Sequence, residues 1–431
     1  MRILMFGWEF PPYISGGLGT ACLGITSALR KLGHEITFVL PGIGGGKKEP
    51  HVKLVSASEI SFYETNSRTE QLSKLSKTQD SLNIKVIDSL LISYTDEYQY
   101  RKLLAETHSK QPLGVAEKGE VPGNYGPNLL AEVLRYAGAA EIIAYKEKFD
   151  IIHGHDWTSV FACLQAKKTS GKPYVYHVHA LEFDRSGENI NRTIYGIEKY
   201  GMETADHIIA VSQYTRESIV SRYGISPEKI TVVHNAVSGR KNGTMQRMGE
   251  NGNRKIVLFL GRITFQKGPN YFVEAARLVL ESLPEVTFVM AGTGDMMSSM
   301  MGRIAELRIG ENFRFTGFLR GAEVERIYAT SDLYVMPSVS EPFGIAPLEA
   351  VLHNVPVIIS RQSGVSEVLH HVLKVDFWNA RELASKIITL LRYPFIGHEM
   401  SKHAREELRT IKWEYAAEKI LSIYRQVSEV S

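Results

Sequence analysis

The sequence has little cysteine and no long apolar run. Its two cysteines, Cys22 and Cys163, form neither a Cys-x-x-Cys pair nor a zinc-binding spacing. No stretch approaches the roughly 18 apolar residues of a membrane span, and the start lacks the apolar run and cleavage site of a signal peptide. These absences exclude a disulfide scaffold and predict a cytoplasmic protein with two buried thiols. Peripheral association with a membrane stays open.

An excess of charge of one sign is also missing. The 50 basic and 47 acidic residues leave a net charge of only +3. A dedicated nucleic-acid-binding protein normally concentrates basic charge on one face, so no nucleic-acid partner is expected. A local basic pocket for an anionic ligand is still compatible with this balance. At 431 residues the chain is too long for one ordinary core, and two domains are expected.

The first half of the chain alternates short apolar runs with helix-length segments, which is typical of a parallel, doubly wound sheet. A helix is expected at 17–32, and the region 41–80 is less regular, with a polar surface loop at 64–70. The expected strands are 2–7, 35–40, 84–87, 150–153, 174–177, 208–211 and 230–233.

A glycine-rich stretch at 239–254 marks a linker, because it holds four glycines and almost no large aliphatic residue. The same alternation then restarts, with helices expected at 270–281 and about 398–427. The strands expected here are 255–260, 287–291, 313–316, 333–336, 355–359 and 373–375. The sequence thus predicts an α/β protein of two Rossmann-like doubly wound domains, 1–238 and 255–397, with a cleft between them. Ligands of such sheets bind in the loops after the strands.

The segment 340–349 is the richest in chemistry. It follows an expected strand, and Pro342 and Gly344 favour a tight turn before a helix that starts near Ile345. The first N–H groups of that helix could receive a phosphate, whereas Glu341 and Glu349 would suit sugar hydroxyl groups. The alternative is an acidic residue favoured by the helix dipole plus one solvated glutamate.

Arg262 and Lys267 follow the first expected strand of the second domain, in a loop bounded by glycines. Such a pair can clamp a diphosphate, since arginine binds it bidentately and lysine acts as a point charge. The sequence contains no Asp-x-Asp pair that would hold a divalent ion on a sugar nucleotide, so no metal is assigned. The alternative is two solvated loop cations.

Two glycine loops also follow expected strands. Gly16 and Gly17 open the first helix, where a ligand can approach the backbone closely. Gly292 lies in a similar loop of the second domain. Neither loop matches the dinucleotide fingerprint Gly-x-Gly-x-x-Gly.

Two pairs of alternate histidines end strands of the first domain. His153 and His155 precede Asp156, and His177 precedes His179 by two residues. Neither pair has the cysteine or third histidine that would favour a metal site. We therefore expect one structural histidine and one histidine facing the cleft in each pair, with Asp156 as a polar contact there.

Together these motifs resemble those of the GT-B glycosyltransferases, specifically family four and the starch and glycogen synthases of family five. The resemblance spans both halves of the chain in the same order. It rests on the glycine pair at 16–17, the His-x-His-Asp-Trp at 153–157, His179, the pair Arg262 and Lys267, and the segment 341–349.

The resemblance implies a metal-independent, retaining transferase whose substrate is a nucleoside-diphosphate sugar, with no cofactor. In it, Arg262 and Lys267 would neutralise the donor diphosphate. The transferred sugar would contact Glu341, His179 and the backbone of 343–345, which is Phe343, Gly344 and Ile345.

The resemblance also places Glu349 on the nucleotide ribose and Gly16 and Gly17 near the diphosphate. The helix at about 398–431 would cross back onto the first domain. Retention is usually explained by attack on the same face of the sugar, so no protein nucleophile is needed, and none is evident in the sequence.

Two features distinguish the chain from starch synthases. Ile14 stands where those enzymes carry a lysine, and Glu349 is present where they usually lack a glutamate; both favour family four. The Gly-Gly-Leu at 16–18 and the His-Asp-Trp at 155–157 favour glucan synthases. The favoured function is transfer of glucose to an α-glucan. The alternatives are transfer of another hexose to a small-molecule, lipid or glycan acceptor, a sugar-nucleotide 2-epimerase, and a non-catalytic sugar-nucleotide binder.

Overall fold

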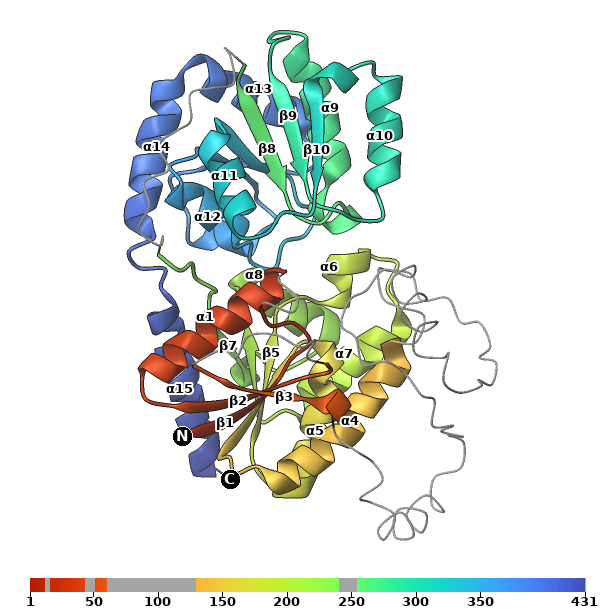
Figure 1. Cartoon of the computed structure of the whole chain (residues 1–431), viewed down its shortest axis with the longest axis vertical. Helices are drawn as coiled ribbons and strands as arrows, with labels where there is room; N and C mark the ends of the chain where they lie inside the picture. The colour runs from red at the N-terminus through yellow and green to blue at the C-terminus, as the bar shows by residue number, and fades with distance from the viewer. Residues whose placement is uncertain (12–15, 43–50, 60–128, 240–253, 431) are drawn as a thin grey trace, which may run out of the picture. The chain divides into compact units, whose positions relative to one another are not determined.

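A computed structural model describes residues 1–11, 16–42, 51–59, 129–239 and 254–430 (Figure 1). The strand expected at 84–87, the polar loop at 64–70, Ile14 and almost all of the expected linker lie outside these residues. Among the described residues, no helix is long and apolar enough to span a membrane.

The first sheet has seven parallel strands in the order β3-β2-β1-β4-β5-β6-β7. Their bounds are β1 Arg2–Phe6, β2 Glu35–Leu40, β3 Lys53–Ser56, β4 Ile151–His155, β5 Tyr174–Val178, β6 His207–Ala210 and β7 Ile230–Val232. The described helices beside it are α1 Gly17–Lys31, α4 Leu129–Lys146, α5 Val160–Ser170, α6 Glu182–Ser186, α7 Arg192–Thr204 and α8 Gln213–Ser218. The strand order reverses between β1 and β4, and such a switch point is where open sheets bind ligands.

The second sheet has six parallel strands in the order β10-β9-β8-β11-β12-β13, with its switch point between β8 and β11. Its strands are β8 Ile256–Leu260, β9 Thr287–Ala291, β10 Phe313–Gly317, β11 Leu333–Met336, β12 Val357–Ser360 and β13 Leu373–Val375. The helices that follow are α9 Pro269–Leu280, α10 Met297–Glu306, α11 Ala322–Thr330, α12 Ala346–Leu352, α13 Ala380–Arg392, α14 Pro394–Glu407 and α15 Trp413–Val430. The predicted fold class, two doubly wound parallel sheets, is confirmed.

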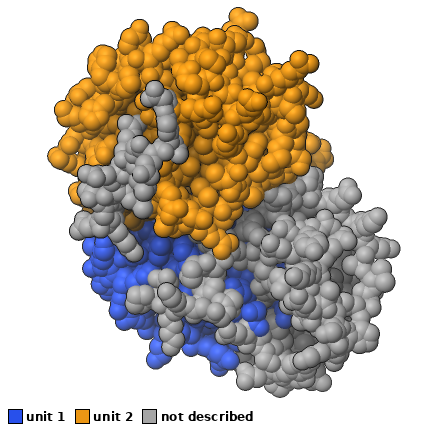
Figure 2. All heavy atoms as spheres, turned by 45° about the horizontal axis from the view of Figure 1, so that its top comes forward, with its two compact units in different colours: residues 1–177, 197–207, 423–431 blue, residues 178–196, 208–422 orange. Residues whose placement is uncertain are grey.

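The described residues form two compact units, coloured in Figure 2. The first unit comprises Met1–His177, Ile197–His207 and Ile423–Ser431, and the second comprises Val178–Gly196 and Ile208–Ser422. Residues 178–196 and 208–239 thus fall in the second unit, although β7 and most of β6 lie in them and belong to the first sheet. The sequence predicts these residues in the first domain. The predicted boundary at 239–254 stays a prediction.

Buried side chains hold each sheet against its helices. In the second unit, Val257 and Phe259 of β8 and Phe288 of β9 pack against Phe272 and Ala276 of α9, and all five are at most 2% exposed. Helices α9 and α13 pack side by side (Figure 1). In α1 and α5, Cys22 and Cys163 are buried free thiols, and burial raises the pKa of both.

Two local predictions were wrong. The irregular region after β2 contains the edge strand β3, which pairs with β2 from Thr37↔Lys53 to Leu40↔Ser56. At four residues this strand is too short to show a clear alternation. The helical stretch expected at 398–427 is two helices, α14 and α15, separated at Leu408–Lys412. The Thr410 hydroxyl bonds the Glu407 carbonyl oxygen in that turn, at 2.9 Å, which favours a turn over a continued helix.

Tyr136 of α4 ties the helix to the first sheet, because its buried hydroxyl lies 2.7 Å from the Val39 carbonyl oxygen and 3.1 Å from that of Gly7. We expect Tyr136→Phe to lower the free energy of unfolding by about 1–3 kcal/mol, since two buried carbonyls lose a donor. Urea denaturation followed by circular dichroism measures the change. The control Tyr200→Phe, at a side chain that is 49% exposed, should change it by less than about 0.5 kcal/mol. Equal effects of the two variants would contradict the role of Tyr136.

Candidate functional site

Two loops meet at the switch point of the second sheet. One follows β8 and carries Arg262 and Lys267, and the other follows β11 and carries Glu341. A backbone hydrogen bond of 2.9 Å from the Val339 N–H to the Gln266 carbonyl oxygen joins them. The sequence analysis placed these charged residues after two strands, and the sheet order explains why they are neighbours.

Glu341 is the centre of this site. Its side chain is only 8% exposed, and one carboxylate oxygen lies 2.5 Å from the Lys267 Nζ. The Ser338 hydroxyl donates to the same oxygen at 3.2 Å. The backbone of Glu341 is fixed as well, because its N–H donates to Gln362 and its carbonyl accepts from Gly364. A buried carboxylate needs such partners, and Lys267 and Ser338 supply them.

Glycines let the loops of this site approach one another. Gly268 has φ +64°, and a Cβ there would collide with the Pro337 carbonyl oxygen. Gly292 has φ +138°, and a Cβ there would collide with the Gly261 carbonyl oxygen. Gly292, predicted as a contact of the cleft, thus has a packing role beside the Arg262 loop.

Arg262 lies at the exposed edge of the same loop. Its guanidinium donates to the Gln266 side-chain oxygen at 3.3 Å. Lys267 is half-buried against Glu341, whereas Arg262 presents its charge to solvent. The two cations are therefore held differently, one inside the site and one at its rim.

The turn after Glu341 leads into α12, as expected. Phe343 is buried and accepts a backbone hydrogen bond of 2.7 Å from Val365. Gly344 has φ +97°, a conformation that favours glycine, and Ile345 is the N-cap residue of α12. The backbone at 343–345 is thus rigidly placed at the end of β11.

Glu349 follows Glu341 in the sequence and lies in the first turn of α12. The Tyr328 hydroxyl donates to its carboxylate at 3.2 Å. Burial raises the pKa of Glu349, and the hydrogen bond from Tyr328 partly offsets this. The two glutamates therefore have different surroundings: Glu341 faces a cation, and Glu349 faces a neutral hydroxyl.

Several residues that were not predicted from the sequence support the 340–344 loop. The Ser340 hydroxyl lies 2.5 Å from an Asp184 carboxylate oxygen and 3.0 Å from the Tyr214 hydroxyl. Burial raises the pKa of Asp184, and the hydrogen bond from Ser340 opposes it. The Ser212 hydroxyl donates to the Pro342 carbonyl oxygen at 2.5 Å. These residues come from 178–239, so only the fold could reveal them.

His179 belongs to the same compact unit as this loop. Burial lowers the pKa of its imidazole to about 3, so the ring is neutral at physiological pH. A neutral imidazole both donates and accepts a hydrogen bond. His179 is thus suited to bind a hydroxyl group rather than to supply a positive charge.

Gly16 and Gly17 lie in the first unit, at the start of α1, where Gly16 is the N-cap residue. The Glu9 carboxylate accepts from the N–H groups of Gly16 and Gly19, at 3.1 and 3.2 Å. Glu9 was not predicted from the sequence as a residue of this loop. Its carboxylate occupies the place at a helix N-terminus where an anion is favoured.

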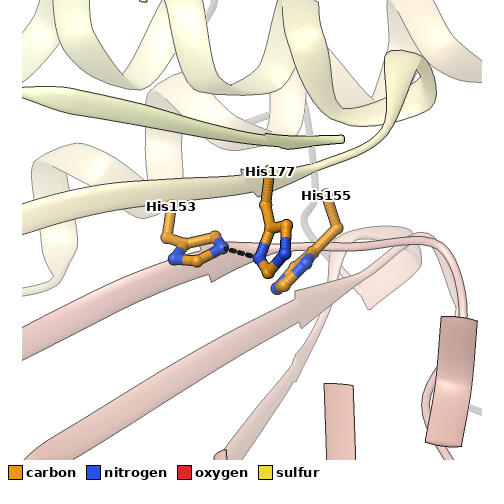
Figure 3. A group of neighbouring side chains, drawn as sticks. All are labelled: His153, His155 and His177. Atoms are coloured by element: carbon orange, nitrogen blue, oxygen red, sulfur yellow. Dashed lines mark hydrogen bonds between the residues drawn. The ribbon is translucent and has the colours of Figure 1, made fainter. Parts of the chain in front are cut away.

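The histidine pairs do not divide as expected. His153 and His155 of β4 and His177 of β5 are all fully buried. Their ring nitrogens lie within 4.8 Å of one another, and Figure 3 shows the three rings side by side. The prediction of one cleft-facing histidine in the first pair was wrong, because residues 153 and 155 share one face of the strand. Asp156, with φ +56°, turns the chain just after them.

Two family models match most of the chain. The model "Glycosyltransferase Family 4" matches residues 99–238, and "Glycosyl transferases group 1" matches residues 241–407. The second match contains Arg262, Lys267, Glu341 and Glu349.

Curated relatives carry related names. An uncharacterised glycosyltransferase of Methanocaldococcus jannaschii is 24% identical over 100% of this chain and 99% of its own length. A glycogen synthase of Mycobacterium tuberculosis is 23% identical, over 98% and 94%. An alpha-maltose-1-phosphate synthase of Mycolicibacterium smegmatis is 30% identical, over 65% of this chain and 80% of its own.

Solved structures share the fold. Sucrose-phosphate synthase from Thermosynechococcus elongatus has a TM-score of 0.70 at 17% identity, with both chains fully covered. HepE of Anabaena, solved in complex with UDP-glucose, has a TM-score of 0.67 at 17% identity, over 99% of this chain and 100% of its own. With its two doubly wound sheets, its cation and carboxylate site and these matches, the chain belongs to the GT-B glycosyltransferases of the family 4 and group 1 type.

Proposed function

We propose that this protein is a retaining, metal-independent glucosyltransferase that moves glucose from a nucleoside-diphosphate glucose to an α-glucan. The observation that carries the proposal is the pairing of Lys267 with the buried Glu341 at the switch point, with Arg262 on the same loop. The similarity to a glycogen synthase and to a structure holding UDP-glucose supports the glucan and the donor class.

Arg262 and Lys267 are assigned to the donor diphosphate. The glycosyl–phosphate bond breaks as negative charge accumulates on the leaving group, so preplaced cations lower the barrier. Lys267 is already 2.5 Å from Glu341. On donor binding its three N–H groups can bond both the carboxylate and a phosphate oxygen. Arg262 can then bind a second oxygen from the rim of the site.

The carboxylates are assigned to hydroxyl groups. Glu341, bonded to Lys267 and Ser338, accepts from hydroxyls of the transferred glucose, beside the backbone of Phe343, Gly344 and Ile345. Glu349 accepts from the ribose of the nucleotide. The two side chains thus fix the donor at its sugar and at its ribose.

Four further residues are assigned to the substrates: Gly16, Gly17, Asp156 and His179. Neutral His179 is assigned to a hydroxyl of the donor sugar near the reacting carbon. The backbone of Gly16 and Gly17 is assigned to the diphosphate, and Asp156 to a polar contact of the substrate. The leaving phosphate would accept the proton of the attacking hydroxyl, which gives retention without a protein nucleophile.

A second candidate is transfer of a hexose to a small phosphorylated acceptor. The observation that favours it is the 30% identity to an alpha-maltose-1-phosphate synthase, higher than the identity to the glycogen synthase. Glu349 also agrees better with family four than with starch synthases. Both candidates use the same donor site and differ in the acceptor.

The first prediction from this proposal concerns the substrates. We expect a nucleoside-diphosphate glucose to raise the melting temperature, and the best donor among ADP-, UDP- and GDP-glucose to extend glycogen or maltooligosaccharides. Proton NMR of the product should show a new α-linkage, because a retaining transferase keeps the α-configuration of the donor. A parallel incubation with a hexose phosphate tests the second candidate. Donor alone tests for an epimerase. Binding without any transfer would contradict the proposal.

The second prediction concerns the diphosphate. Arg262→Ala should lower turnover about 100- to 1,000-fold, the usual effect of losing a group that stabilises developing charge. Its melting temperature should stay unchanged, because the side chain is exposed. Lys267→Ala should lower turnover to a similar extent and also lower stability, since Glu341 loses its partner. The exposed Arg409→Ala is the matched control. Near-normal turnover in both site variants would rule out these roles.

The third prediction concerns metal ions. Transfer should continue at an unchanged rate in excess EDTA, since Arg262 and Lys267 supply the positive charge that a divalent ion would otherwise bring to the diphosphate. The measurement compares initial rates with chelator, with added Mg²⁺ and with added Mn²⁺. A rate that is lost with chelator and restored by either ion would refute metal independence.

A further inference from the structure

His153, His155 and His177 gather at the carboxyl edge of the first sheet, outside the site described above. In the parallel register, His155 is the direct neighbour of His177 on the adjacent strand. His153 lies two residues earlier on β4 and so points to the same face. All three rings therefore come from rigid strands of one compact unit (Figure 3).

The distances among the rings fit metal coordination. The His153 Nε2 lies 3.2 Å from the His177 Nδ1. Two nitrogens that bind one tetrahedral ion at 2.0–2.1 Å lie about 3.3 Å apart. The ring centroids are separated by 4.5, 5.3 and 5.5 Å, close to the roughly 5 Å that three imidazoles around such an ion would have. One ring nitrogen of each histidine lies within 4.8 Å of those of the other two.

One of the three rings is also held through its other nitrogen. The His153 Nδ1 lies 2.5 Å from the Tyr424 hydroxyl, so the Nε2 of the same ring is the nitrogen directed at its neighbours. Metal-binding histidines usually bond a polar group through the other ring nitrogen, which fixes the ring and its tautomer. Tyr424 belongs to the part of α15 in the same compact unit and is fully buried.

We propose that His153, His155 and His177 form a binding site for one Zn²⁺-class divalent transition-metal ion. Three imidazoles suit zinc and its neighbours rather than Mg²⁺ or Ca²⁺, which prefer oxygen ligands. Three protein ligands leave a fourth position for a water molecule. The site is separate from the diphosphate-binding role of Arg262 and Lys267, so it does not depend on the proposed function.

Binding of Co²⁺ and Zn²⁺ to the metal-free full chain tests this site without any donor or acceptor. We expect one Co²⁺ per chain with the visible absorption bands of tetrahedral cobalt, displaced by Zn²⁺, and a melting temperature raised by Zn²⁺. Absence of the bands and of one-to-one binding in the wild-type protein would overturn the proposal.

Variants separate this site from surface histidines. His177→Gln should weaken Co²⁺ binding at least about 100-fold. Tyr424→Phe should weaken it about 10- to 100-fold, as is usual when a residue that orients a metal-binding histidine is lost. The control is His371→Ala, at an exposed histidine beside Glu407, which should bind as the wild type does. Circular dichroism confirms that each variant is folded. Unchanged binding by folded His177→Gln would also overturn the proposal.

Discussion

The ion pair of Lys267 and Glu341 is the interaction on which the candidate site depends. A carboxylate that is 8% exposed must be compensated, and the cation comes from the loop after the neighbouring strand. This requirement brings the β8 and β11 loops together. The backbone bond from Val339 to Gln266 and the lack of a side chain at Gly268 let the loops close to that distance. Charge neutralisation and backbone packing thus select one geometry.

The two glutamates of this short segment have different environments. Glu341 stands at the end of β11 against a cation, and Glu349 stands inside α12 against the Tyr328 hydroxyl. Eight positions separate them, with the rigid turn at Gly344 between them. Beneath the turn, Ser212 and Asp184 bond Pro342 and Ser340. The loop is therefore held by side chains from outside its own segment.

Sequence reasoning found the features that depend on local pattern. The apolar runs predicted every described strand of both sheets except the short edge strand β3. Arg262, Lys267 and Glu341 were found because each lies in the loop after a predicted strand. Features that depend on contacts between distant residues were not predicted. Asp184 and Ser212 gave no signal, since their partners lie some 130 to 156 residues away. The histidine cluster was not predicted, although the sequence shows the alternation His153-x-His155. Its third member, His177, comes from the next strand, so only the sheet brings it to the other two.

Gly364 lies against the 340–344 loop and limits which residues can occupy its position. A Cβ at this position would collide with the Pro342 carbonyl oxygen and with the Ser212 side chain. The Gly364 N–H also bonds the Glu341 carbonyl oxygen. Substitution at 364 would therefore displace the 340–344 loop, because the backbone of Pro342 cannot make room for a side chain. The shape of this loop thus depends on a residue outside it, at a position where any Cβ is excluded.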